Sequence, residues 1–194
     1  MKSVKLASIV PAALILILSA AVSVQAAPVS PAAQSGWSYG MELDALPFAT
    51  GGYYVSGWAG KGPLRIRGVY SDVTVPNLVV PDGFNDWKLT AAALIVDYFP
   101  KWKGSYEGPW VGAGIEQWDS SIRPDGSIVR GDFRGNVLTV GGGYVYRFNE
   151  HLYINPWIAG HLRSGGDSRV IIDGKELNVP DFSPELSVKL GWSF

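Results

Sequence analysis

Apolar and polar side chains alternate along the whole of segment 182–194, and this pattern constrains the fold more than any other. Successive side chains of a β-strand point to opposite faces of the sheet. A strand here therefore has one apolar face and one polar or small face, over a length sufficient to cross a membrane. The apolar face is Phe182, Pro184, Leu186, Val188, Leu190, Trp192 and Phe194. The other face is Ser183, Glu185, Ser187, Lys189, Gly191 and Ser193.

The amino-terminal segment has the pattern of a signal peptide. Lys2 and Lys5 precede an apolar stretch at 9–22, and Val24-Gln25-Ala26 supplies the small residues of a cleavage site. We predict export through the Sec pathway and cleavage after Ala26. A retained membrane anchor is the alternative, but the stretch is short for a membrane span. The predicted parts are a signal peptide at 1–26, a flexible lead-in at 27–36 and one barrel domain at 37–194.

Charge and composition exclude several classes of protein. The chain has 16 Lys and Arg against 17 Asp and Glu, and loss of Lys2 and Lys5 with the leader leaves 14 − 17 = −3. This balance gives no bias toward nucleic acid. The absence of cysteine excludes disulfides, lipidation at cysteine and thiolate metal sites. Two histidines are too few for a dedicated transition-metal site, and we predict no cofactor and no metal.

A membrane-spanning fold for the mature chain must be a closed β-barrel. No apolar run after the leader is long enough for a membrane helix, and only a closed barrel leaves no strand edge unpaired in lipid. Eight strands are predicted, and the last should close against the first. Alternation does not assign the faces of the fourth. The predicted strands are 37–47, 52–59, 63–75, 87–99, 109–122, 132–148, 152–163 and 182–194.

The predicted connections are of two kinds. Segments 60–62 and 149–150 are tight turns, whereas the longer, polar loops, rich in Gly, Pro and Asp, are 76–85, 123–131 and 164–181. Outer-membrane barrels have short periplasmic turns and longer extracellular loops. Two connections depart from this pattern, because 49–51 is short for an outer loop and 100–108 is long for a periplasmic turn.

Aromatic residues are predicted to form two bands, at the two ends of the strands. Amphipathic rings concentrate at the headgroup level of a bilayer. The alternative is that the rings fill the core of a soluble β-protein. The periplasmic band is predicted to contain Trp37, Tyr39, Tyr98, Trp110, Tyr144, Tyr146, Tyr153, Trp192 and Phe194. The outer band is predicted to contain Tyr70, Trp87, Trp118, Phe133 and Phe182.

The inward face of the predicted strands carries many charges. An eight-stranded barrel is just wide enough inside for side chains to fill it, and buried charges must pair. The favoured interpretation is a mutually neutralising network that plugs the lumen. A narrow, gated or water-filled path lined by the same groups is the alternative. The predicted lumen residues are Glu42, Asp44, Arg65, Arg67, Glu116, Arg147, His161, Arg163, Glu185 and Lys189, with Asn155 beside them.

The signal sequence, the eight alternating segments, the outward loops and the terminal Trp-Ser-Phe resemble the small outer-membrane β-barrel proteins typified by the OmpA transmembrane domain, OmpX and OmpW. The resemblance implies an outer-membrane location, contact with lipid and lipopolysaccharide, and insertion by periplasmic chaperones and the barrel-assembly machinery. It implies a structural, adhesive or narrow-transport role. It also implies a carboxy-terminal assembly signal, consisting of Leu186, Val188, Leu190, Trp192 and Phe194.

Some small outer-membrane barrels modify lipid A, and the residues near His161 are the candidates for such chemistry in this chain. The deacylase barrels place a serine two residues after the histidine, and here that position is Arg163. Ser164 would point to the opposite face of a strand from His161. We therefore predict a non-enzymatic protein that acts in envelope integrity or surface interaction, with lipid A modification as a weaker alternative.

Three other functions remain open from the sequence. The first is a narrow transport barrel for small or hydrophobic solutes. The second is a soluble periplasmic barrel of lipocalin type with reversed polarity. The third is phosphate binding by arginines in the outer loops, although many Asp residues lie among them. The oligomeric state is left open.

Overall fold

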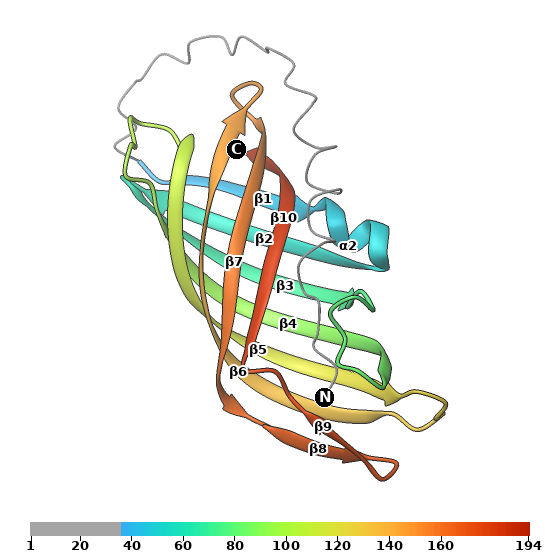
Figure 1. Cartoon of the computed structure of the whole chain (residues 1–194). Coiled ribbons are helices and arrows are strands. Elements are labelled where there is room, and N and C mark those ends of the chain that lie inside the picture. Colours follow the sequence, from blue (N-terminus) through green and yellow to red (C-terminus); the bar gives the residue numbers. More distant parts are fainter. Residues whose placement is uncertain (1–35) are drawn as a thin grey trace, which may run out of the picture.

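The structure, a computed structural model that describes residues 36–194, is a closed antiparallel barrel of eight strands (Figure 1). This confirms the predicted fold. No helix in this part of the chain is long and apolar enough to cross a membrane. The predicted signal peptide, and nearly all of the lead-in, lie outside the described residues. The barrel strands are β1 (Ser38–Asp44), β2 (Gly52–Lys61), β3 (Leu64–Thr74), β4 (Phe84–Tyr98), β5 (Gly108–Pro124), β6 (Gly131–Arg147), β7 (Leu152–Gly166) and β10 (Phe182–Ser193).

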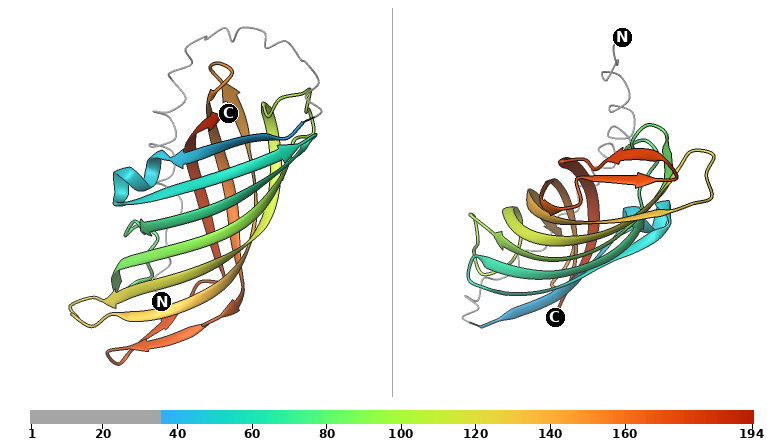
Figure 2. Two further views of the ribbon diagram at one scale, coloured as in Figure 1. Left: turned by 180° about the vertical axis from the view of Figure 1, so that it is seen from behind. Right: turned by 90° about the horizontal axis from the view of Figure 1, so that it is seen from below.

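The barrel closes between its first and last strands. Strand β1 pairs with β10 in a register that sets Gly40 opposite Ser193 and Asp44 opposite Lys189. The backbone N–H of Phe194 donates to the carbonyl of Tyr39 at 3.0 Å. Strand β10 pairs on its other side with β7, and the remaining barrel strands pair with their sequence neighbours, so the sheet has no open edge (Figure 2). The predicted closure is confirmed.

The two ends of the barrel differ. The turn end carries Gly62, the 148–151 turn and the carboxy-terminal Phe194. The loop end carries the segment 75–83, a short helix α2 (Ala45–Thr50) and a hairpin of β8 (Arg169–Ile172) and β9 (Lys175–Asn178). Two predictions are therefore corrected: the first strand does not continue to residue 47, and segment 164–181 is not all loop.

Helix α2 begins where β1 ends because Asp44 caps it. The Asp44 carboxylate accepts a hydrogen bond from the backbone N–H of Leu46 at 2.9 Å, which satisfies a donor that has no partner within the helix. Pro47 fits in this first turn, where a missing N–H costs little.

Alternation along the strands separates an apolar outside from a mixed inside. On β10, Leu186, Leu190 and Trp192 are exposed, whereas Ser187 and Lys189 are buried. The outward face of all eight strands carries large exposed apolar side chains. The aromatic prediction was wrong for the inward-facing rings, because their strand positions share the parity of lumen residues. These are Trp110 and Tyr153 at the turn end and Trp87, Trp118 and Phe133 at the loop end.

Two buried apolar clusters lie at different heights in the molecule. One lies inside the barrel and includes Trp58, Phe99, Tyr106, Trp110 and Trp157. The other lies at the loop end, where the β8–β9 hairpin packs its apolar face onto the barrel. Its members are Phe84, Trp87, Ile122, Phe133, Ile172 and Leu177.

Candidate functional site

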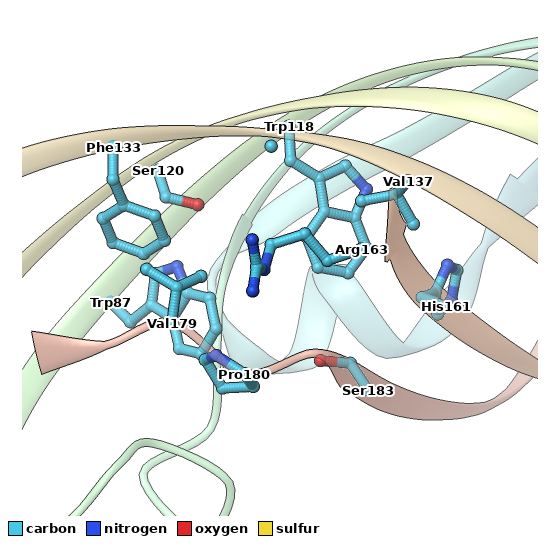
Figure 3. Close-up of a pocket in the computed structure, with 11 residues that line it drawn as sticks. Trp87, Trp118, Ser120, Phe133, Val137, His161, Arg163, Val179, Pro180 and Ser183 are labelled. Carbon is cyan, nitrogen blue, oxygen red and sulfur yellow. The ribbon is translucent and has the colours of Figure 1, made fainter. Parts of the chain in front are cut away.

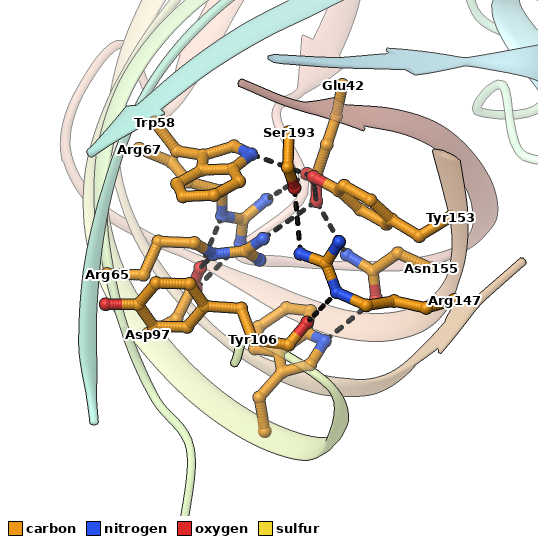
Figure 4. A network of polar contacts seen from close by, with 11 residues as sticks. Glu42, Trp58, Arg65, Arg67, Asp97, Tyr106, Arg147, Tyr153, Asn155 and Ser193 are labelled. Atoms are coloured by element: carbon orange, nitrogen blue, oxygen red, sulfur yellow. Dashed lines mark hydrogen bonds and ion pairs between the residues drawn. The ribbon is translucent and has the colours of Figure 1, made fainter. Parts of the chain in front are cut away.

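Four charged side chains meet at the centre of the lumen (Figure 4). Arg65 and Arg67 lie two residues apart on β3 and therefore both point inward. Asp97 Oδ2 accepts hydrogen bonds from Arg65 Nε at 2.8 Å and Arg67 Nε at 2.7 Å. Glu42 Oε1 accepts from Arg65 Nη1 at 3.0 Å, and Glu42 Oε2 lies 3.6 Å from Arg67 Nη1. All four side chains have an exposed fraction of 0%.

Neutral groups complete this network. Glu42 Oε1 also accepts from Tyr153 Oη and Asn155 Nδ2, each at 3.1 Å. Trp58 Nε1 donates to Tyr153 Oη at 2.8 Å, and Trp110 Nε1 donates to Asn155 Oδ1 at 2.8 Å. We call this set the central plug: Glu42, Trp58, Arg65, Arg67, Asp97, Trp110, Tyr153 and Asn155. Two positive and two negative charges balance within it.

Aromatic rings pack against the cations. The Arg67 guanidinium lies 4.9 Å from the Trp110 ring centroid, and the Arg65 guanidinium lies 5.2 Å from that of Phe99. Lys189 is fully buried, and its Nζ has no hydrogen-bond partner in the described structure but lies 3.5 Å from the Trp157 ring centroid. Ring faces attract cations. Asp44 lies opposite Lys189 in the strand register and adds a carboxylate near it.

The long connection between β4 and β5 closes the turn end of the lumen. The Tyr106 hydroxyl donates to the Leu64 carbonyl at 2.7 Å, and the Tyr106 ring packs edge-on against Trp58 and Phe99. Arg147 Nη2 donates to Ser193 Oγ at 2.8 Å, and its Nε donates to the Tyr106 carbonyl at 3.3 Å. The unusual length of this connection is explained by the side chains that it places inside the barrel.

A second polar cluster lies nearer the loop end and centres on His161. Its Nε2 lies 2.9 Å from Glu185 Oε2, and its Nδ1 lies 2.9 Å from Thr139 Oγ1. The Thr139 hydroxyl donates to Glu116 Oε1 at 2.6 Å, as does Trp118 Nε1 to Glu116 Oε2. Because the Thr139 proton is already donated, its oxygen accepts from the ring. Both ring nitrogens are then donors, which is the hydrogen-bond pattern of an imidazolium.

A cavity of about 370 Å³ lies between the central plug and the loop end and is open to the outside there. We call it the vestibule. Its floor is formed by Tyr54, Ile95 and Trp157. Its apolar wall comes from β3 and β4, and its polar wall from β1, β5, β7 and β10. The apolar wall includes Val69, Val73, Leu89, Ala91 and Ala93, and the polar wall includes Asp44, Glu116, His161, Glu185 and Ser187.

A smaller recess of about 20 Å³ adjoins the vestibule (Figure 3). Trp87, Trp118 and His161 line both spaces. Phe133 and Arg163 line the recess but not the vestibule. This volume suffices for about one water molecule, so the vestibule is the only one of these two spaces with room for a larger ligand.

The loop-end arginines are occupied within the chain. Arg123 and Arg130 lie 3.2 Å and 2.5 Å from Asp86, and Arg134 lies 2.6 Å from Asp119. Arg163 pairs with Asp181, and Arg169 lies 3.3 Å from Glu176. These carboxylates therefore neutralise the arginines locally and leave little positive field for phosphate.

Among solved structures, neisserial surface protein A is similar to this chain, with a TM-score of 0.53 at 19% identity over 82% of this chain and 98% of that one. The amino-terminal β-barrel domain of OprF from Pseudomonas aeruginosa aligns at a TM-score of 0.48 and 15% identity, over 81% and 97% of the two chains. The chain has the fold of the small outer-membrane β-barrels. No family model and no curated protein matches it. At such low identity the likeness concerns the fold alone.

The ten predicted lumen residues lie in several separate places in this outer-membrane-type barrel. Glu42, Arg65 and Arg67 meet in the central plug. Lys189 is beside it, with Asp44 nearby as the cap of α2 and an acceptor from Ser187. The other five lie apart from the plug: Glu116, His161 and Glu185 form the vestibule cluster, Arg147 closes the turn end, and Arg163 pairs at the loop end.

Asp97 is the charged plug residue that the sequence did not reveal. It bonds both plug arginines, yet it belongs to β4, whose faces alternation did not assign. The signal available was its position, since Asp97 lies opposite Arg65 in the register of β3 and β4.

The residues near His161 do not present a nucleophile. Thr139, His161 and Glu185 form a hydroxyl–imidazole–carboxylate row, which is the order of groups in a hydrolytic triad. However, the Thr139 side chain is buried, already donates to Glu116 and lines neither of the two cavities. Ser164 donates to the Asn136 carbonyl and is directed away from His161.

Proposed function

We propose that this protein is an integral outer-membrane barrel with a closed lumen, which acts without catalysis in envelope integrity or surface interaction. A membrane location is supported by the large apolar side chains that are exposed on the outside of every strand. In water such a surface would be an aggregation liability, whereas lipid solvates it. The polarity is the opposite of that expected for a soluble barrel with an apolar interior.

The observation that carries the proposal is the central plug. Its ionic side chains have no exposed surface, and Tyr106 and Arg147 cover the turn end beneath it. Ions passing through the lumen would have to break hydrogen bonds between fully buried charges, which costs several kcal/mol per ion. The vestibule therefore ends at the central plug and does not continue through the barrel as a channel.

The proposal also includes partners. Lipid tails would contact the exposed belt, and lipopolysaccharide would surround the loop end. Periplasmic chaperones and the barrel-assembly machinery would act on the chain during biogenesis, with the outward face of β10 as a recognition element. That face consists of Leu186, Val188, Leu190, Trp192 and Phe194, which point away from the lumen.

Conductance across a planar bilayer tests the closed lumen. The wild-type protein should give no discrete current steps. A charge-balanced variant with Glu42, Arg65, Arg67 and Asp97 all changed to Ala, combined with Tyr106→Ala, should give steps if it folds. Steps from the wild-type protein would reject the proposal and favour a transport barrel. Release of the protein by osmotic shock without detergent would reject the membrane location.

A further inference from the structure

We propose that the vestibule binds a small organic cation that carries an apolar body. This inference goes beyond the closed lumen proposed above, because a structural barrel needs no ligand. It rests on the size of the cavity, on an apolar wall where lumen walls are ordinarily polar, on an excess of carboxylates, and on aromatic side chains at the cavity wall.

The cavity has the size of a ligand site. At about 370 Å³ it falls within the range of roughly 300–1,000 Å³ typical of small-molecule pockets. It exists because the inward positions of β3 and β4 hold small side chains here, including Ser71, Ala91 and Ala93. At the level of the plug the same two strands present Arg65, Arg67 and Asp97 instead, and no such space is left.

One wall suits an apolar body. Leu89, Ala91, Ala93 and Ile95 follow one another at every second position of β4 and line the cavity together with Val69. The interior of an outer-membrane barrel is ordinarily polar. An apolar ligand against this wall would remove apolar surface from water, worth roughly 25 cal/mol per Å².

The opposite wall suits a cation. Asp44, Glu116 and Glu185 line the cavity, and His161 as an imidazolium together with Lys189 opposite Asp44 leaves a net charge of 2 − 3 = −1. No Arg or Lys is among the described residues that line it. Lys189 and Arg67 lie 3.5 Å and 5.5 Å from the Trp157 ring centroid, so they repel a cation from the floor and favour its placement near Glu185.

Aromatic side chains also line this space. Trp118 stands beside His161, with ring centroids 5.2 Å apart, and offers a ring face close to Glu116 and Glu185. The Tyr54 hydroxyl is more than nine-tenths buried, lines the cavity and has no hydrogen-bond partner in the described structure. The same holds for Trp87 Nε1 and Trp157 Nε1. These three donor atoms have almost no accessible surface, so their side chains border the cavity without exposing the donors in it.

Three probes with one apolar body and different charge test the proposal: 4-phenylbutylamine, 4-phenylbutanol and 4-phenylbutyrate. Each is titrated calorimetrically into the full-length mature protein in nanodiscs of uncharged lipid, with empty nanodiscs as the blank. The amine should bind saturably and about tenfold more tightly than the alcohol, and the acid should bind most weakly. Equal affinities, a preference for the acid or the absence of saturable binding would overturn the proposal.

Two variants locate the binding. Glu185 is 32% exposed and its side chain pairs with His161, so Glu185→Gln should fold. This variant should weaken binding of the amine about three- to tenfold and leave binding of the alcohol unchanged. Glu150→Gln, at the turn end, is the matched control and should change neither. Ala93→Phe should fill the cavity and abolish binding of both the amine and the alcohol. Unchanged amine binding in both Glu185→Gln and Ala93→Phe would place the ligand elsewhere and refute the site. Conductance is independent of these results, so failure here leaves the closed lumen standing.

Discussion

The two halves of the lumen are built from the same strands but filled in opposite ways. The half toward the turn end is packed with Trp and Tyr side chains around two arginines and two acids whose charges balance. The half toward the loop end is a cavity with a net negative wall. Strand β3 shows the change within a few residues, from Arg65 and Arg67 to Val69 and Ser71. Strand β4 shows it from Asp97 to Ala93 and Ala91. The size of the inward side chains therefore decides where an eight-stranded barrel is closed and where it is hollow.

The halves should also differ in how they respond to substitution. In the plug each ion depends on a partner, because water cannot replace a lost hydrogen bond there. In the vestibule a lost contact can be replaced by water. The predictions that follow run from the largest expected effect to the smallest.

Asp97→Ala should destabilise the barrel most, by about 3–5 kcal/mol, because it leaves Arg65 and Arg67 buried with one carboxylate between them. Urea unfolding in lipid vesicles, followed by tryptophan fluorescence, measures this. Asp119→Ala removes an ion pair whose side chains are 48% and 77% exposed, and it should cost about 0.2–1 kcal/mol. Similar losses of unfolding free energy for the two variants would show that the buried plug charges contribute no more to stability than an exposed ion pair.

Tyr106→Ala should cost about 3 kcal/mol, since it removes a buried ring that packs on Trp58 and Phe99. Conductance should nevertheless stay absent in this single variant, because the layer of ion pairs above remains intact. If current steps appear, the connection between β4 and β5 is the seal, and the ion pairs serve stability alone.

Adding volume distinguishes the two halves directly. A Cβ at Gly112 would lie 2.6 Å from Asp97 Oδ1 and 3.0 Å from the Val96 carbonyl, so Gly112→Ala should cost about 1–3 kcal/mol. Ala93→Leu adds more atoms but extends them into the vestibule, and it should change the free energy of unfolding by less than about 1 kcal/mol. A larger loss of unfolding free energy for Ala93→Leu than for Gly112→Ala would mean that the vestibule is filled in the folded protein.

Much of the fold follows from the sequence, because membrane strands alternate over long segments. The last strand shows it best: Leu186, Leu190 and Trp192 face outward and Ser187 and Lys189 inward, as alternation predicts. The pairing of this strand with β1 also followed. Helix α2 and the β8–β9 hairpin did not, because each is too short to have a recognisable period.

The candidate site was predictable only where the lumen is polar. Glu42, Arg65 and Arg67 interrupt apolar neighbours and so reveal their parity. Strand β4 gave no such signal, because Leu94 and Val96 face outward while Ala93 and Ile95 face the vestibule, and both parities are apolar. Strand β4 does not alternate because its inward residues form the apolar wall of the vestibule. For the same reason the sequence did not show that Asp97 points inward. Position near a strand end does not reveal where Trp110 and Tyr153 point, because the parity of each residue decides which face of the strand it occupies.

The most direct measurement compares two serines of the lumen, in a chain without native cysteine. Ser71 lines the vestibule, and Ser56 is buried between Tyr54 and Trp58 on β2, opposite Glu42 in the register. Ser71→Cys and Ser56→Cys are nearly isosteric, and both are treated in vesicles with small, water-soluble methanethiosulfonate reagents. The account predicts that Ser71→Cys reacts at least about 100-fold faster, and faster with a cationic than with an anionic reagent. Equal rates at the two positions would contradict a sealed plug beneath an open vestibule.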